Sequence, residues 1–226
     1  MSTPHRAEHH LVVPRTARFY TVGELAPATD DLWIVCHGYG QLAASFIETF
    51  EVVAAPRRVI VAPEGLSRFY LDRNRSAADP NPAVGATWMT REDREHEIED
   101  HVRYLDALVD HVRARVATDR VRLRVLGFSQ GVATVGRWIE RGRVRVNDLV
   151  LWAGSFPTDV DLTVAAGRLA NVPVTVVVGT RDQLASWAAA DTQVARFTAA
   201  GITARLVQFD GGHRLDDDTL RMLADA

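Results

Sequence analysis

Short apolar runs alternate along this chain with longer amphipathic stretches, and this alternation limits the possible folds more than any other feature. Six runs rich in β-branched residues end close to Gly, Pro or Asp and are predicted as strands at 32–36, 58–62, 123–126, 149–152, 174–178 and 204–209. Their unbroken apolar character is typical of parallel strands that are covered on both faces. The sequence therefore predicts an α/β protein with a mostly parallel sheet and helices on both faces.

An antiparallel edge and five helices complete the expected architecture. Residues 11–13 and 18–22 flank Pro14 and are predicted to form an N-terminal hairpin at one edge of the sheet, where a proline is tolerated. Helices are predicted at 41–53, 91–117, 131–141, 184–200 and 216–225. The second helix is the clearest, because its apolar residues recur every three or four positions. Its three histidines, His96, His101 and His111, are predicted to face solvent.

The chain is long enough to fold as one domain. At 226 residues, area scaling removes about 70% of the unfolded surface from water, so the core needs no disulfide or metal. No repeat or shift in composition marks a boundary, and residues 1–226 are predicted to be a single domain in which 1–10 are frayed. Residues 64–90 form a long interval that is predicted to be either a lid-like or binding loop or an excursion covering the sheet edge.

Charge and cysteine content exclude several classes of function. A formal charge of −3 and a pI near 6.2 provide no strong field for nucleic acid or anionic lipid. All 26 basic residues are arginines, which excludes mechanisms that need a lysine amine. The single cysteine, Cys36, and the lack of a long apolar segment favour a cytoplasmic protein without stable membrane insertion. Nothing in the sequence indicates an oligomeric state.

A nucleophile motif follows the third predicted core strand. Residues 127–131 read Gly-Phe-Ser-Gln-Gly and match G-x-S-x-G between a strand and a helix. The glycines let backbone segments crowd around a sharp turn that holds the serine hydroxyl at a helix N-terminus. Unpaired N–H groups there stabilise negative charge on a bound carbonyl oxygen. Ser129 is therefore predicted to be a nucleophile rather than an ordinary helix-capping serine.

A serine hydroxyl needs a base, and the base needs an orienting acid. Asp182 follows the fifth core strand, and His213 follows the sixth after a pair of glycines. The order Ser, Asp, His along the chain is that of the α/β-hydrolases. Asp210, Asp216 and Asp217 are nearer to His213 in sequence, but Asp182 leaves a neighbouring strand end at the same sheet edge. We therefore expect Asp182 to be the acid.

A second turn, after the first core strand, is suited to binding negative charge. His37-Gly38-Tyr39-Gly40 matches the H-G-x-G turn that supplies an oxyanion-binding amide in this kind of fold. The backbone amides of Tyr39 and Gln130 are predicted to form an oxyanion hole. His37 itself is expected to hold the turn by hydrogen bonds rather than to transfer protons.

These motifs together resemble the carboxylesterase, phospholipase and acyl-protein-thioesterase branch of the serine α/β-hydrolases. The resemblance covers about residues 30–220, and the Gly-Phe-Ser-Gln-Gly pentad is more specific than the bare motif. It implies an α/β-hydrolase fold, a small-molecule ester or thioester substrate, a catalytic triad of Ser129, Asp182 and His213, and an oxyanion hole at Tyr39 and Gln130.

Residues 62–70 and 87–90 are similar to predicted bacterial esterases of this branch, and the same region differs from the eukaryotic thioesterases. The candidate substrate contacts lie here and just beyond. They are Tyr70, Arg73, Trp88 and Met89, with Arg68 or Arg73 as a candidate partner for an acidic acyl group.

Two other functions are also compatible with the sequence. Residues 38–43 also fit G-x-G-x-x-A after a strand, with Glu64 as a ribose-binding acid, which indicates a dinucleotide-binding oxidoreductase. The second alternative is a hydrolase-fold binding protein that has lost its chemistry. His96 and His101 resemble a zinc-protease motif, but residues five apart lie about 140° apart around a helix. This spacing excludes the zinc-protease motif, and because acyl transfer by Ser129, His213 and Asp182 needs neither, no metal and no cofactor is expected.

Overall fold

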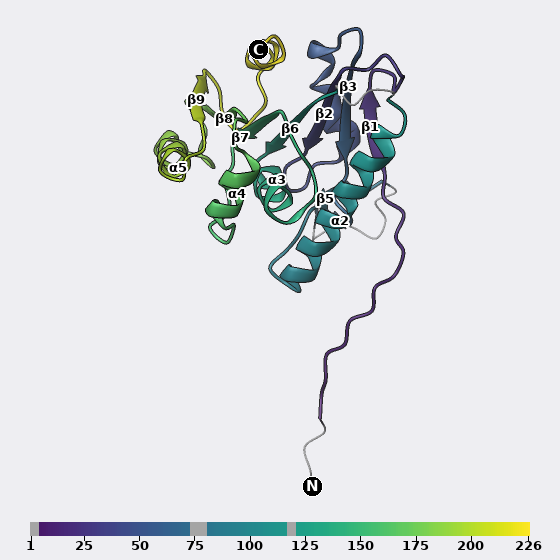
Figure 1. The fold of residues 1–226 in the computed structure, drawn as a ribbon. Helices are drawn as coiled ribbons and strands as arrows, with labels where there is room; N and C mark the ends of the chain where they lie inside the picture. The colour runs from purple at the N-terminus through teal and green to yellow at the C-terminus, as the bar shows by residue number, and fades with distance from the viewer. Residues whose placement is uncertain (1–4, 73–80, 117–120) are drawn as a thin grey trace.

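The computed structural model describes residues 5–72, 81–116 and 121–226. Seven strands form one sheet in the spatial order β1-β3-β2-β6-β7-β8-β9 (Figure 1). Their bounds are β1 Phe19–Val22, β2 Asp31–Cys36, β3 Arg58–Pro63, β6 Arg122–Phe128, β7 Asp148–Trp152, β8 Val174–Gly179 and β9 Ala204–Phe209. All neighbouring strands pair in parallel except β1, which runs antiparallel to β3. The predicted α/β fold and the six predicted core strands are confirmed.

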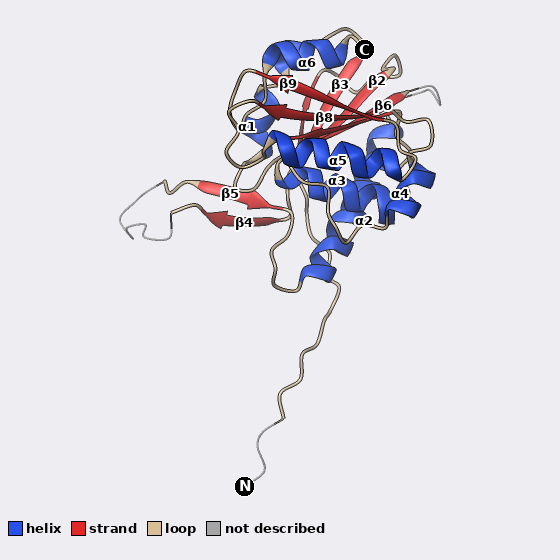
Figure 2. Ribbon diagram, turned by 90° about the vertical axis from the view of Figure 1, so that its left-hand side faces the viewer, coloured by secondary structure: helices blue, strands red, loops and turns tan. Residues whose placement is uncertain are grey.

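Helices cover both faces of the sheet (Figure 2). One face packs against α2 (Arg94–Arg113), α3 (Gln130–Arg141), α4 (Leu162–Arg168) and α5 (Trp187–Ala199). The other face packs against α1 (Ala43–Glu48), the 3₁₀ turn η1 (Glu51–Val53) and α6 (Asp217–Ala224). Strand β2 supplies both cores, because Leu32 and Ile34 face the first layer and Trp33 and Val35 the second. No helix in the described part of the chain is long and apolar enough to cross a membrane.

The N-terminal edge and one helix differ from the sequence predictions. Residues 11–13 form no strand, and Leu11 is 85% exposed, so β1 alone supplies the antiparallel edge and the predicted hairpin is wrong. Helix α4 was not expected, since only Ala165 of its seven residues is buried and the helix shows no apolar periodicity. A local feature starts it: the Asp161 carboxylate accepts hydrogen bonds from the amides of Thr163 and Val164.

The described parts of the interval 64–90, residues 64–72 and 81–90, contain two short strands, and residues 73–80 of the predicted lid-like or binding loop lie outside the described residues. Strands β4 (Ser67–Tyr70) and β5 (Val84–Thr87) pair antiparallel in a small sheet set apart from the main one (Figure 2). Strand β5 lies directly against the turn that follows β2, because the Gly40 amide donates to the Ala86 carbonyl oxygen at 2.8 Å. A side chain at Gly85 would meet the Gly40 carbonyl oxygen at 2.4 Å. The small sheet therefore supports the turn that carries Tyr39.

His101 is buried within α2, with 1% of its surface exposed, which contradicts the prediction that it faces solvent. Its ring packs edge-on against Trp88, with centroids 6.5 Å apart. Burial lowers the pKa of His101 to about 4, and the charges of Arg137 and Arg141 act in the same direction. The imidazole is neutral in the folded protein at pH 7.

We expect the free energy of unfolding to fall as the pH drops from 6.5 toward 4. The folded pKa of His101 lies below the ordinary value, so the unfolded chain binds more protons in this window and acid favours unfolding. The loss attributable to this group is about 3 kcal/mol. Urea unfolding at pH 7 and pH 4 measures it, and His101→Phe should show a smaller difference between the two pH values than wild type. His111→Phe on the exposed face is the control, and equal pH dependence in wild type and His101→Phe would refute the prediction.

Candidate active site

Ser129 lies in a sharp turn between β6 and α3. Its backbone has φ 54° and ψ −115°, a strained conformation for a residue with a side chain, and its amide donates to the Trp152 carbonyl oxygen at 2.8 Å. Close approach explains the flanking glycines. A side chain at Gly127 would lie 2.4 Å from the Gly131 carbonyl oxygen, and one at Gly131 would lie 2.2 Å from the Cys36 carbonyl oxygen. Ser129 makes no capping hydrogen bond to α3, so its hydroxyl is not used as a helix cap.

The turn after β8 and the turn after β9 bring Asp182 and His213 to Ser129. The His213 Nε2 atom lies 2.9 Å from the Ser129 Oγ atom, and the Nδ1 atom lies 2.9 Å from Asp182 Oδ2. The Asp182 side chain is fully buried, and its Oδ1 atom accepts the amides of Leu184 at 2.8 Å and Ala185 at 2.9 Å. Because its carboxylate is fixed in this way, Asp182 accepts a hydrogen bond from His213 Nδ1–H, and Nε2 is left unprotonated to accept a hydrogen bond from the serine hydroxyl.

Two of the three acidic residues that are closer to His213 in sequence make contacts elsewhere. Asp210 pairs with Arg181. The Asp216 carboxylate begins α6 by accepting the Thr219 amide at 3.2 Å. The structure thus brings together the three residues that chain order selected, and places Asp210 and Asp216 in other contacts.

The turn after β2 lies beside Ser129. Within the described part of the chain, neither the Tyr39 nor the Gln130 amide donates to a protein acceptor. Gln130 is the first residue of α3, and a first-turn amide has no acceptor within its own helix. The Gln130 side chain is held in turn by hydrogen bonds to Thr87 Oγ1 and the Met89 carbonyl oxygen, each at 2.9 Å. A side chain at Gly38 would lie 3.1 Å from Ser129 Cβ, so the turn that carries Tyr39 is close to the serine, and the Tyr39 and Gln130 amides stay candidate oxyanion donors.

His37 holds this turn in place. Its Nδ1 atom lies 2.7 Å from the Gly38 carbonyl oxygen, and its Nε2 atom accepts the Gly65 amide at 3.0 Å. The Trp88 indole N–H donates to the His37 carbonyl oxygen at 2.9 Å. Burial lowers the pKa of His37, so the ring stays neutral. These contacts match the structural role expected for His37.

The candidate substrate contacts are dispersed. Tyr70 is 48% exposed on β4, and Arg73 lies outside the described residues. Trp88 is only 2% exposed, so its ring is buried beneath the surface and offers little area to a substrate. The Met89 side chain is half-buried, and its sulfur lies 3.5 Å from Arg137. Of these residues, Tyr70 is the one that the structure shows to be well exposed.

Glu64 is unavailable to a ribose. Its fully buried carboxylate accepts hydrogen bonds from Arg18 at 2.7 Å and Arg68 at 2.5 Å, and from the Ala43 amide at 3.2 Å. Burial disfavours the charged form, but these hydrogen bonds outweigh it and lower the pKa of Glu64. The dinucleotide-binding hypothesis therefore lacks a carboxylate that could bind the ribose. The charge of Arg68 is likewise directed at Glu64, which leaves it poorly placed for an acidic acyl group.

A pocket of about 410 Å³ opens beside His213. Residues that are distant in sequence contribute its apolar lining, namely Leu42, Phe46, Val84, Phe128 and Leu215. Sequence reasoning missed these residues because no local pattern links the segments that supply them. A larger groove of about 750 Å³ runs along α2 and the N-terminal segment and contains none of Ser129, Asp182 and His213.

The fold and the Ser-His-Asp arrangement define the class of this protein. Enzymes with this sheet, with the nucleophile on a strand-to-helix turn and with the acid and the histidine following in that order, are serine hydrolases of the α/β-hydrolase class. The chain belongs to the phospholipase/carboxylesterase family, whose model matches residues 21–226. It is accordingly an enzyme that hydrolyses ester or thioester bonds.

Solved structures show the same fold at low sequence identity. Esterase PE8 matches with a TM-score of 0.68 and 21% identity over 92% of this chain and 96% of that one. Acyl-protein thioesterase 2 of Zea mays matches with a TM-score of 0.69 and 15% identity over 93% and 97%. The Bacillus cereus carboxylesterase matches with a TM-score of 0.66 and 13% identity over 92% of each chain. A search of curated proteins finds no match.

Proposed function

We propose that this hydrolase cleaves small carboxylic esters or thioesters through an acyl-enzyme on Ser129. The observation that carries the proposal is the continuous chain of hydrogen bonds from Ser129 Oγ through His213 to the buried Asp182, each 2.9 Å long. A nucleophile, a base and an orienting acid in this geometry are what acyl transfer requires.

The reaction follows from the positions of the atoms. His213 Nε2 takes the Ser129 proton while the oxygen attacks the carbonyl carbon, and the resulting oxyanion accepts hydrogen bonds from the Tyr39 and Gln130 amides. His213 then gives its proton to the leaving alcohol or thiol as the bond to the carbonyl carbon breaks. In the second half, His213 deprotonates a water molecule that attacks the acyl-enzyme, and Ser129 regains its proton as the acid leaves. Asp182 stays ionised and stabilises the imidazolium.

The pocket beside His213 indicates a substrate with a short or medium apolar group. Its volume of about 410 Å³ lies in the lower part of the range for small-molecule sites. Phe46, Phe128 and Leu215 give it an apolar wall, and Arg214, which also lines it, pairs with Asp216 at 3.2 Å. We infer that the acyl chain occupies this pocket while the leaving group faces solvent near Tyr39 and Tyr70, which are both exposed.

An acyl-chain series of matched oxygen and sulfur esters tests the substrate class. We expect kcat/KM to rise with each methylene until the pocket is full and then to fall, because further methylenes find no apolar wall. Val84→Phe fills part of the pocket and should shift the optimum to shorter chains. Val164→Phe, at an exposed position on α4, is the control and should leave the profile unchanged.

An unchanged chain-length profile in Val84→Phe would mean that the acyl group binds elsewhere, while the roles of Ser129 and His213 would stand. A cytoplasmic location and the lack of nucleic-acid partners stay predictions that rest on the buried Cys36 and the net charge of −3.

A further inference from the structure

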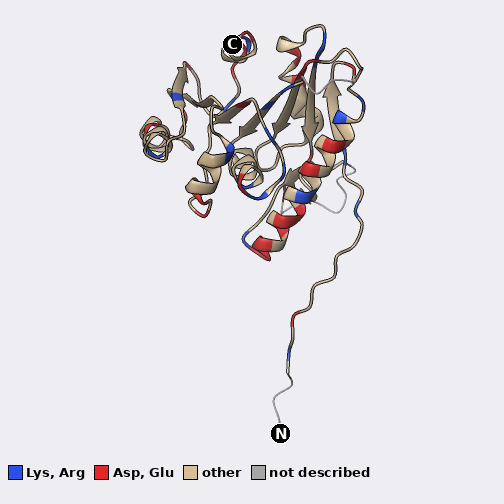
Figure 3. Ribbon diagram, viewed as in Figure 1, with Lys and Arg blue, Asp and Glu red and all other residues tan. Residues whose placement is uncertain are grey.

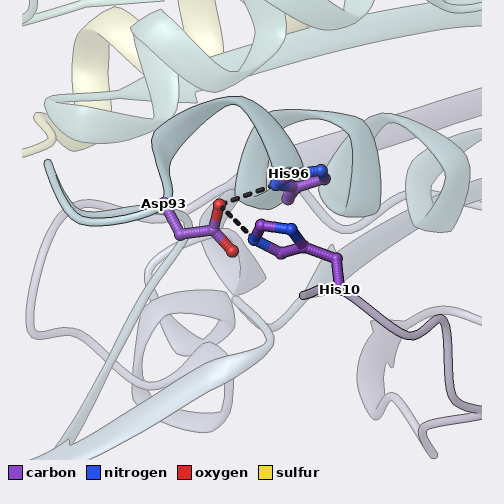
Figure 4. A group of neighbouring side chains, drawn as sticks. All are labelled: His10, Asp93 and His96. Atoms are coloured by element: carbon purple, nitrogen blue, oxygen red, sulfur yellow. Dashed lines mark hydrogen bonds and ion pairs between the residues drawn. The ribbon is translucent and has the colours of Figure 1, made fainter. Parts of the chain in front are cut away.

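Three side chains with metal-binding atoms meet at the start of α2, outside the candidate active site. His10 comes from the N-terminal segment, while Asp93 and His96 come from the beginning of the helix (Figure 4). One ligand atom from each residue lies within 4.8 Å of the other two. The Asp93 Oδ1 atom is 2.6 Å from His96 Nδ1 and 3.3 Å from His10 Nε2, so both imidazoles point at the same carboxylate oxygen.

The chemistry of this set fits a transition metal ion. Imidazole nitrogen and carboxylate oxygen bind Zn²⁺ at about 2.0–2.2 Å, so ligand atoms around a tetrahedral ion lie roughly 3.3–3.6 Å apart. The separations of 2.6 Å and 3.3 Å from Asp93 Oδ1 to the two imidazoles require only small side-chain movements, and all three side chains are partly exposed. Divalent ions such as Mg²⁺ prefer oxygen ligands, which makes two imidazoles a poor site for them.

The backbone at Asp93 also serves this arrangement. Asp93 is the N-cap residue of α2, yet its carboxylate makes no capping hydrogen bond and turns toward the two histidines instead. Its φ of 47° is a left-handed conformation that aspartate and asparagine tolerate better than other residues with side chains. Two acidic residues, Glu95 and Glu97, follow in the first turn and offset the positive end of the helix dipole (Figure 3).

The two imidazole rings stack with centroids 4.0 Å apart, and Glu8 adds a second carboxylate on the N-terminal segment, 3.2 Å from His10 Nε2. We propose that His10, Asp93 and His96 bind a divalent transition metal ion, Zn²⁺ foremost, and that the ion fastens the N-terminal segment to the start of α2. The fastened segment forms one wall of the groove of about 750 Å³ along α2. This site is separate from Ser129 and takes no part in ester hydrolysis.

Titration of the full chain with ZnCl₂, followed by calorimetry, tests the proposal. The protein is first labelled on its reactive serine with a fluorophosphonate, so that His213 does not contribute to binding. We expect one equivalent of Zn²⁺ to bind, with affinity at least about tenfold weaker in His96→Ala and in Asp93→Asn. Mutating even the residues that hydrogen-bond to metal ligands lowers metal affinity about tenfold or more, so the loss of a ligand should cost at least as much. Asparagine retains the left-handed backbone of Asp93, so Asp93→Asn removes only the carboxylate charge. His9→Ala, next to His10, is the matched control and should bind as wild type.

Trypsin cleavage supplies a second readout that does not depend on activity. Zn²⁺ should slow cleavage after Arg15, between the metal and β1, and should leave cleavage after Arg6 unchanged, because Arg6 precedes the fastened residue. The protection should vanish in His96→Ala. Equal Zn²⁺ affinity in wild type and His96→Ala, an equal loss in His9→Ala, or no stoichiometric binding would each overturn the proposal.

Discussion

Replacing Ser129 by alanine is expected to lower kcat/KM for p-nitrophenyl acetate by more than a thousandfold, and His213→Ala is expected to do the same. The two side chains act as a unit, so removing either abolishes the attack on the carbonyl carbon, and only the oxyanion-binding amides and substrate binding are left to accelerate hydrolysis. Steady-state kinetics on the purified variants measures the loss.

Two control variants keep this result interpretable. Ser155→Ala removes a hydroxyl from an exposed position, and His111→Ala removes an exposed imidazole from α2, and both should retain wild-type turnover. The thermal midpoint of Ser129→Ala should stay close to that of wild type, because alanine occupies the same strained backbone as serine. Wild-type-like turnover in Ser129→Ala or His213→Ala would contradict the assignment.

Asp182→Asn is expected to reduce kcat by about 10⁴, the scale of the same change in a serine protease triad. The Oδ1 atom of Asp182 accepts two backbone amides, so an asparagine keeps its oxygen there and turns its NH₂ group toward His213. His213 Nδ1 must then accept that hydrogen bond, and the ring proton moves to Nε2, where it faces the serine hydroxyl. His213 Nε2 can then no longer act as the base, although asparagine has the same shape as aspartate.

The matched control for Asp182→Asn is Asp210→Asn, which removes a carboxylate three residues from His213 that pairs with Arg181. Its kcat should stay within a few-fold of wild type. If Asp182→Asn retained activity within tenfold of wild type while Asp210→Asn lost it, Asp210 would be the acid instead.

The sequence predicted the main sheet and the site geometry because both depend on local patterns. Each core strand is an uninterrupted apolar run, and Ser129, Asp182 and His213 each follow such a run at the same end of the sheet. Parallel strands bring their carboxyl ends to one edge, so chain order was enough to predict that Asp182, rather than a nearer acid, lies beside His213.

The features that sequence reasoning missed depend on contacts between distant segments. His101 is buried because Trp88 covers it, and the helical pattern alone did not show which segment would pack there. Strands β4 and β5 are each only four residues long and are separated in sequence. An alternation of apolar and polar residues over four positions is too short to predict a strand. The approach of His10 to His96 joins residues 86 positions apart that no motif connects.

Labelling with a fluorophosphonate, followed by mass spectrometry of the digested protein, tests directly whether Ser129 is the nucleophile. We expect one covalent adduct, on the hydroxyl of Ser129, formed rapidly in wild type and slowed by orders of magnitude in His213→Ala. An adduct on a different serine, or a wild-type protein that stays unlabelled, would contradict it.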